Sequence, residues 1–176
     1  SGAVANIYVE QFIGGGWSPL GSGAAGGSGV SGSGSAIPEF SLATDGARVS
    51  IAWTQPLGGS SQIYLRQYSG TGWSEVSGSA SGNGLSNTVG SAAQPSVAYS
   101  AGALFVAWQA TANGQANIAA AMNGGAGWSP LTIDTPPSAG NAVSRGAASL
   151  PQLSQAGPTL ELLWIERRLG GAPSQD

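Results

Sequence analysis

Three copies of one sequence unit constrain the fold of this chain more than any other feature. An apolar run, a glycine turn and the triplet Gly-Trp-Ser follow one another three times, in residues 6–20, 62–76 and 117–131. The tryptophans of these triplets, Trp17, Trp73 and Trp128, are separated by 56 and 55 residues. Self-similarity at a fixed period is the signature of a repeat architecture. The chain therefore predicts one structural unit used three times.

Each unit predicts four short antiparallel strands. In the last complete unit, residues 95–99 and 104–108 flank a turn and have the alternation typical of a hairpin. Residues 117–122 and 128–133 flank a second, glycine-rich turn. The second strand of every unit is apolar on both faces, with Trp108 on one face and the small Ala107 on the other. Burial on two faces requires neighbouring sheets on both sides, as in a β-propeller.

The predicted fold class is therefore all-β, a single propeller unit over residues 1–176 built from four-stranded antiparallel blades. Residues 38–76 form the second blade and 95–133 the third. The remaining segments are half-blades: 6–20 supplies strands three and four, and 151–168 supplies strands one and two. Propellers have about four to eight blades. We expect two chains to close a six-bladed homodimer that shares two blades; the alternative is a fragment of a longer array.

Segments rich in glycine and serine separate the units, at 21–37, 77–94 and 132–150. Their composition is that of flexible linkers. Each nevertheless contains an apolar residue followed by serine at a comparable place: Val30-Ser31, Leu85-Ser86 and Val143-Ser144. This shared register predicts ordered loops, each held over the blade edge by one apolar side chain.

The succession of IYLRQY, GTGWS, a Gly/Ser/Asn loop and PSVAYSAGALFVAW resembles repeats of bacterial β-propellers. It is also similar in repeat length to the propeller lectins. The resemblance covers nearly the whole chain and implies the fold rather than the ligand, because the shared residues are core and turn positions. The glycine turn before Trp73 is similar to the Asp-box of sialidases, but the aspartate of that motif is missing at all three turns.

Charge is scarce, at 7% of residues against about 25% in a typical domain. A net charge of −3 and five scattered arginines provide no basic surface for phosphates, so we expect no nucleic-acid partner. No apolar run approaches the roughly 18 to 20 residues that cross a bilayer, so we expect no membrane association. A surface of Ser, Gly, Thr, Asn and Gln suits a soluble, extracellular or secreted protein.

Enzymatic function is not expected. The chain has no histidine and no cysteine, which removes most nucleophile–base arrangements and most transition-metal sites. No two of its eight acidic residues are spaced as a catalytic pair. We therefore predict no catalytic residue, no metal site and no cofactor. A glycosidase-like propeller, with carboxylates brought together by the fold, is the alternative.

Candidate ligand-binding residues fall in three groups. Trp17, Trp73 and Trp128 could stack on a sugar ring, although a tryptophan repeated beside a glycine turn is more often a packing residue. Glu10 and Arg66 share a third-strand position that varies between units, and their other role would be inter-blade salt bridging or solvent exposure. Asn87 and Arg145 directly follow the shared serine of their loops.

Loops joining the blades and loops joining strands two and three emerge on one face of a propeller, so these side chains would surround one mouth of the ring. Asn83, Asn87 and Asn141 provide neutral donors and acceptors there. The leading hypothesis is a glycan-binding, lectin-like module. Its rival is a structural or protein-interaction scaffold with no small ligand.

Overall fold

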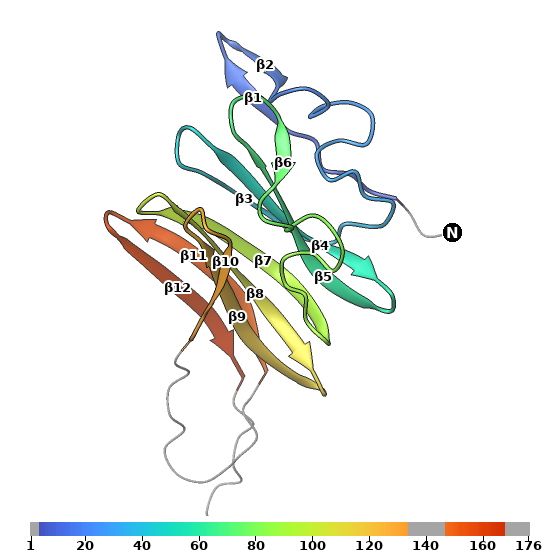
Figure 1. Ribbon diagram of the computed structural model, residues 1–176, viewed down its shortest axis with the longest axis vertical. Helices are drawn as coiled ribbons and strands as arrows, with labels where there is room; N and C mark the ends of the chain where they lie inside the picture. Colours follow the sequence, from blue (N-terminus) through green and yellow to red (C-terminus); the bar gives the residue numbers. More distant parts are fainter. Residues whose placement is uncertain (1–3, 134–146, 168–176) are drawn as a thin grey trace, which may run out of the picture.

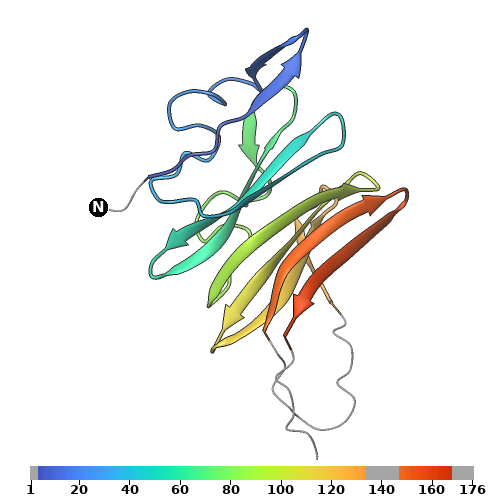
Figure 2. The ribbon, with the colours of Figure 1, turned by 180° about the vertical axis from the view of Figure 1, so that it is seen from behind.

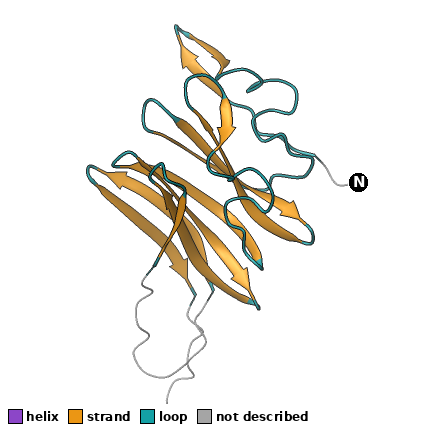
Figure 3. Ribbon diagram, viewed as in Figure 1, coloured by secondary structure: helices purple, strands orange, loops and turns teal. Residues whose placement is uncertain are grey.

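The computed structural model describes residues 4–133 and 147–167, and these form strands and loops with no helix (Figure 3). The first sheet pairs β1 (Glu10–Ile13) with β2 (Gly16–Pro19). The second has the order β3 (Phe40–Thr44), β4 (Val49–Leu57), β5 (Ser60–Tyr68) and β6 (Trp73–Glu75). The third has the order β7 (Ser91–Ser100), β8 (Ala103–Ala112), β9 (Gln115–Asn123) and β10 (Trp128–Leu131). The fourth pairs β11 (Ala148–Ala156) with β12 (Thr159–Glu166).

Every neighbouring pair of strands is antiparallel and consecutive in the chain. The all-β class and the four-stranded antiparallel sheets are thus confirmed. The sheets stack face to face in chain order (Figures 1 and 2). Strand β7 lies against β3, β4 and β5 on one side and against β11 on the other. This propeller-like arrangement places the first strands of successive sheets side by side.

The second strand of a sheet is buried on both faces where a sheet lies on each side of it. On β4, Ile51, Ala52 and Trp53 are almost inaccessible, although consecutive side chains point to opposite faces. Strand β12 differs, because Leu163 is 57% exposed. Within the described part of a single chain, the expected two-sided burial is therefore not met on β12, because no described residue covers its outer face.

Two side chains connect the first strands of neighbouring sheets. The Ser41 hydroxyl of β3 accepts a hydrogen bond from the Val97 backbone N–H of β7 at 3.1 Å. The Ser96 hydroxyl of β7 likewise accepts one from the Leu153 N–H of β11 at 2.8 Å. Small hydroxyl residues on these strands therefore satisfy backbone donors that would otherwise be buried between sheets.

Strands β7 and β11 begin earlier than the sequence predicts, because each contains a bulge before its proline. The pairing register shifts between Ala93 and Ser96, and Gln94 has a positive φ of 55°. A bulge lets the strand continue past a proline, which cannot donate to the ladder. The backbone N–H of Gln94, which precedes the proline, donates to the Glu39 carboxylate beside β3 at 2.6 Å.

The glycine- and serine-rich loops after the first two sheets are ordered, as predicted. The Val30 N–H donates to the Ile7 carbonyl at 2.8 Å, and the Ile7 N–H donates to the Ser31 hydroxyl at 3.0 Å. In the second unit Leu85 and Ser86 make the same two bonds to Ile63, at 2.7 and 2.9 Å. The apolar–serine pair thus anchors each loop along the edge of the third strand. The third pair, Val143-Ser144, lies outside the described residues.

A glycine, Gly29 or Gly84, precedes the first two of these pairs, because the loop backbone there touches the strand. A Cβ on Gly84 would lie 2.4 Å from the Ile63 carbonyl oxygen, and the residue has a φ of +67°. Gly82 has a similar φ of +55° but has no heavy atom within 4 Å of such a Cβ. An alanine at Gly84 would thus meet both a strained φ and a backbone clash, whereas an alanine at Gly82 would meet the strained φ alone.

We expect Gly84→Ala to lower the free energy of unfolding by about 2 kcal/mol or more, since it combines left-handed strain with a backbone clash. Gly82→Ala is the matched control and should cost only the strain, about 1 kcal/mol. Denaturant unfolding of both variants measures the difference. Equal losses would contradict the anchoring role of the close approach.

The second-strand tryptophans differ in how their indole N–H is satisfied. Trp53 donates to the Gln55 side-chain oxygen at 3.1 Å. The Trp108 indole nitrogen is buried and has no partner among the described residues. Ala110 occupies the position that corresponds to Gln55, so the third unit lacks the acceptor that the second unit has.

We expect Ala110→Gln to raise the free energy of unfolding by about 1 kcal/mol, because it supplies that acceptor. Ala110→Met is the control, since it adds similar bulk without an amide oxygen. Equilibrium denaturation compares the two variants. A methionine that stabilises as much as glutamine would show that the gain came from packing alone.

Candidate functional site

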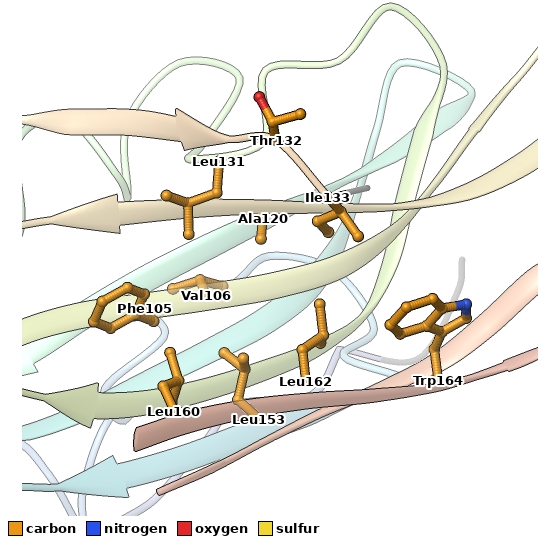
Figure 4. A pocket seen from close by; sticks show the side chains of 10 residues that line it. All are labelled: Phe105, Val106, Ala120, Leu131, Thr132, Ile133, Leu153, Leu160, Leu162 and Trp164. Carbon is orange, nitrogen blue, oxygen red and sulfur yellow. The ribbon is translucent and has the colours of Figure 1, made fainter. Parts of the chain in front are cut away.

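An apolar groove runs between the third and fourth sheets (Figure 4). It encloses about 280 Å³, and only two of its lining side chains, those of Thr132 and Trp164, carry a polar atom. Strands β8, β9 and β10 with the two residues that follow form one wall, and β11 and β12 form the other: Phe105, Val106, Ala120, Leu131, Thr132, Ile133, Leu153, Leu160, Leu162 and Trp164. Such a lining favours apolar contact and offers almost no hydrogen-bonding specificity.

The corresponding space between the second and third sheets is filled. There the third and fourth strands of the following sheet supply Ala119, Ala121 and Trp128, which pack with Leu65 and Val76 of the preceding sheet. Strand β12 is the edge of its sheet within the described part of the chain. The groove is therefore the site where a third and a fourth strand would lie beside β12.

The first sheet presents an exposed aromatic face. Tyr8, Phe12 and Trp17 are 53%, 62% and 69% exposed, and the Phe12 and Trp17 rings meet edge to face at 5.4 Å. Their counterparts in the second sheet are Tyr64, Tyr68 and Trp73, which pack against the first sheet. Side chains that are interfacial on the inner sheets are thus uncovered on the outer one.

The turn tryptophans of the inner sheets join neighbouring sheets. The Trp73 indole N–H donates to the Leu20 carbonyl at 2.7 Å, and that of Trp128 donates to the Val76 carbonyl at 2.7 Å. Both side chains are partly buried. Their positions favour the packing interpretation, whereas the exposed indole of Trp17 remains available for contact.

The other predicted ligand residues are distributed over the fold rather than gathered. Arg66 on β5 donates to the Val30 carbonyl of the first loop at 2.8 Å, so it links two sheets. Glu10 is exposed on β1. Asn87 has a φ of +37° and accepts a hydrogen bond from the Asn83 side chain at 3.0 Å. Arg145 and Asn141 lie outside the described residues. The ligand-binding role of these residues stays a prediction.

A polar cluster between the second and third sheets was not found from the sequence. The Tyr99 hydroxyl lies 2.6 Å from the Ser50 hydroxyl and accepts a hydrogen bond from the Gln67 side chain at 2.8 Å. Burial raises the pKa of the Tyr99 phenol, although the bonds with Ser50 and Gln67 oppose it. Arg48 covers the ring, with its guanidinium carbon 4.8 Å from the centroid.

Arg48 also connects this cluster to two turns. It forms an ion pair with Asp45 at 2.6 Å and donates to the Gly102 carbonyl at 2.9 Å. Partial burial raises the pKa of the Asp45 carboxyl, but hydrogen bonds from Arg48 and Ala47 and the charge of Arg48 outweigh it and lower that pKa overall. These polar groups already have protein partners, so the cluster holds two sheets together.

The sequence indicates the residues of the apolar groove only in part. Leu160, Leu162 and Trp164 are visible as an apolar column, but a column alone indicates core. Their partial exposure appears only when the neighbouring strands are placed. In the described ranges, no three His, Cys, Asp or Glu side chains gather closely enough to hold a metal ion. No helix there has the length and apolar character to cross a membrane.

Comparison with known proteins gives a limited structural likeness. No family model matches the chain, and no curated protein matches it in sequence. The solved structure of the GH32 β-fructofuranosidase BmSUC1 of Bombyx mori aligns with 74% of this chain and 29% of that one, at 14% identity and a TM-score of 0.47. A mutant of it in complex with sucrose aligns with 75% and 30%, at the same identity and TM-score. The chain thus spans about 30% of these proteins.

Proposed function

We propose that this chain is a non-enzymatic assembly module, which associates with another sheet of the same repeat through the apolar surfaces of its outer sheets. One observation supports this function above all. The side-chain positions that the inner sheets bury against each other are exposed on the first sheet and form a groove beside the fourth. Exposed apolar surfaces of this kind mark interaction sites.

The energetic argument favours association. Full burial of one large apolar side chain contributes about 1.5–3 kcal/mol. Phe12 and Trp17 are accompanied by exposed Phe40 and Leu42 on β3 and by Leu163 and Ile165 on β12. The edge strands also favour association, because the unpaired backbone N–H and C=O groups of β1 and β12 can form hydrogen bonds with a strand of another chain.

Association can be tested with charge substitutions on each surface. We expect Phe12→Glu and Leu162→Glu each to weaken self-association by a factor of about 100 or more, because a carboxylate buried without a partner costs about 3 kcal/mol or more. Sedimentation velocity over a concentration series measures the effect. Gln115→Glu is the control, since it adds the same charge at the exposed start of β9.

Phe12 is exposed in the single chain, so its replacement should leave the melting temperature of the isolated fold unchanged. This keeps the test valid even if Leu162→Glu does not fold. A wild-type protein that sediments as one copy at its highest soluble concentration would overturn the assembly function.

Glycan binding is the second candidate, supported by the exposed Trp17 indole with Tyr8 and Glu10 on the same sheet. An exposed flat aromatic and a carboxylate on one sheet suit the apolar face and the hydroxyls of a pyranose. If this candidate is right, Trp17→Ser should abolish binding to a panel of neutral and acidic glycans, and Trp128→Phe should not. Absence of wild-type binding at millimolar concentration would remove the lectin function.

A further inference from the structure

We infer that the groove binds the β1–β2 hairpin of a second copy of this chain, with β1 added in antiparallel fashion to the free edge of β12. The inference rests on the proposed assembly function and names its partner and register. In the described residues the outer edges of β1 and β12 have no neighbouring strand. Two copies related by a two-fold axis would make this contact twice.

The register follows from the two complete sheets. Strand β4 pairs Trp53 with Tyr64 and Ile51 with Arg66 on β5. Strand β8 makes the corresponding pairs, Trp108 with Ala119 and Val106 with Ala121 on β9. Strands β12 and β1 hold the same places in the repeat. Trp164 therefore pairs with Tyr8 of the second copy, and Leu162 pairs with Glu10 of the second copy.

The aromatic face of the hairpin matches the groove in size. Ala120 lines the groove where the first two sheets have the larger Val9 and Leu65. The third sheet is therefore hollowed at this position. The incoming hairpin carries Tyr8 where β9 carries Ala119, so a large side chain meets the widened space.

The docking also supplies an acceptor for the exposed Trp17 indole N–H. Trp73 and Trp128 donate their indole N–H to the carbonyls of Leu20 and Val76 in the preceding sheets. The corresponding carbonyl in the third sheet belongs to Leu131, at the rim of the groove. The exposed Trp17 of the second copy would donate to it, which repeats the inter-sheet bond a third time.

The same docking covers a second pair of exposed surfaces. Val97 and Tyr99 on β7 are buried against a cluster that includes Ala52 of β4. Their counterparts on β3 are Phe40 and Leu42, and the counterpart of Ala52 on β12 is Leu163. All three of these are exposed. With the hairpin in the groove, β3 of the second copy lies against the outer face of β12 and both surfaces are buried.

Engineered disulfides test this register directly, because the chain contains no cysteine. Copies carrying Glu10→Cys and copies carrying Leu162→Cys are produced together with different tags. Opposed residues of an antiparallel pair are about 4.5–5.5 Å apart at Cα, which is inside the disulfide range. Mild oxidation is expected to give a covalent dimer that holds both tags and has the mass of two copies.

The matched control is Gln11→Cys with Leu162→Cys. Gln11 follows Glu10 but points to the opposite face of the hairpin. The same oxidation should therefore give no covalent dimer, and both chains should run at the mass of a single copy without reductant. Tyr8→Cys with Trp164→Cys is a second pair in the same register and should cross-link like the first.

The outcomes separate this inference from the assembly function. One outcome is association that Phe12→Glu weakens, while neither of the two cysteine pairs in the proposed register cross-links. This outcome would overturn the hairpin register and leave the assembly function standing. A cross-linked product larger than two copies would overturn the two-copy closure. Protein that stays a single copy would overturn both.

Discussion

Burial of the second strand on both of its faces is the constraint on which the rest of this structure depends. Strand β4 places Ile51 and Ala52 on opposite faces, and both are almost inaccessible. No single four-stranded sheet can achieve this, since each of its faces would remain in water. Each sheet therefore requires a neighbour before and after it, and the chain satisfies that requirement by repeating one unit. The uncovered Leu163 of β12 is the same constraint left unsatisfied.

The contacts between sheets explain features that the sequence alone leaves ambiguous. The sequence favours packing over sugar stacking for Trp73 and Trp128 without excluding either role, and their indole N–H groups donate to carbonyls of the preceding sheet. Arg66 looks like a variable, ligand-facing residue, yet it donates to the Val30 carbonyl. In both cases a polar group that a ligand could use already has a partner between sheets.

The strands and the anchored loops were predictable, because they depend on alternation and on a repeated register such as Leu85-Ser86. The bulge at Gln94 was not, since its positive φ of 55° is a conformation that a glutamine does not signal. The Tyr99 cluster was missed for a different reason. Ser50 and Gln67 are cross-strand partners on β4 and β5, but Tyr99 of β7 joins them only through the stacking of two sheets. The groove likewise depends on which strands lie beside β12.

Differences in side-chain size between the repeats can specify which sheet packs against which. At the position facing the next sheet, the three units carry Val9, Leu65 and Ala120. The side chains that meet them are Tyr64 for the first and the small Ala119 for the second. In the proposed dimer, Tyr8 would meet the third. A tyrosine facing Leu65 would overpack that interface, and an alanine facing Ala120 would leave a cavity. Both lower the stability of the interface. Large and small side chains thus alternate across the interfaces, so that each hairpin fits one sheet best and the order of the sheets is specified by shape.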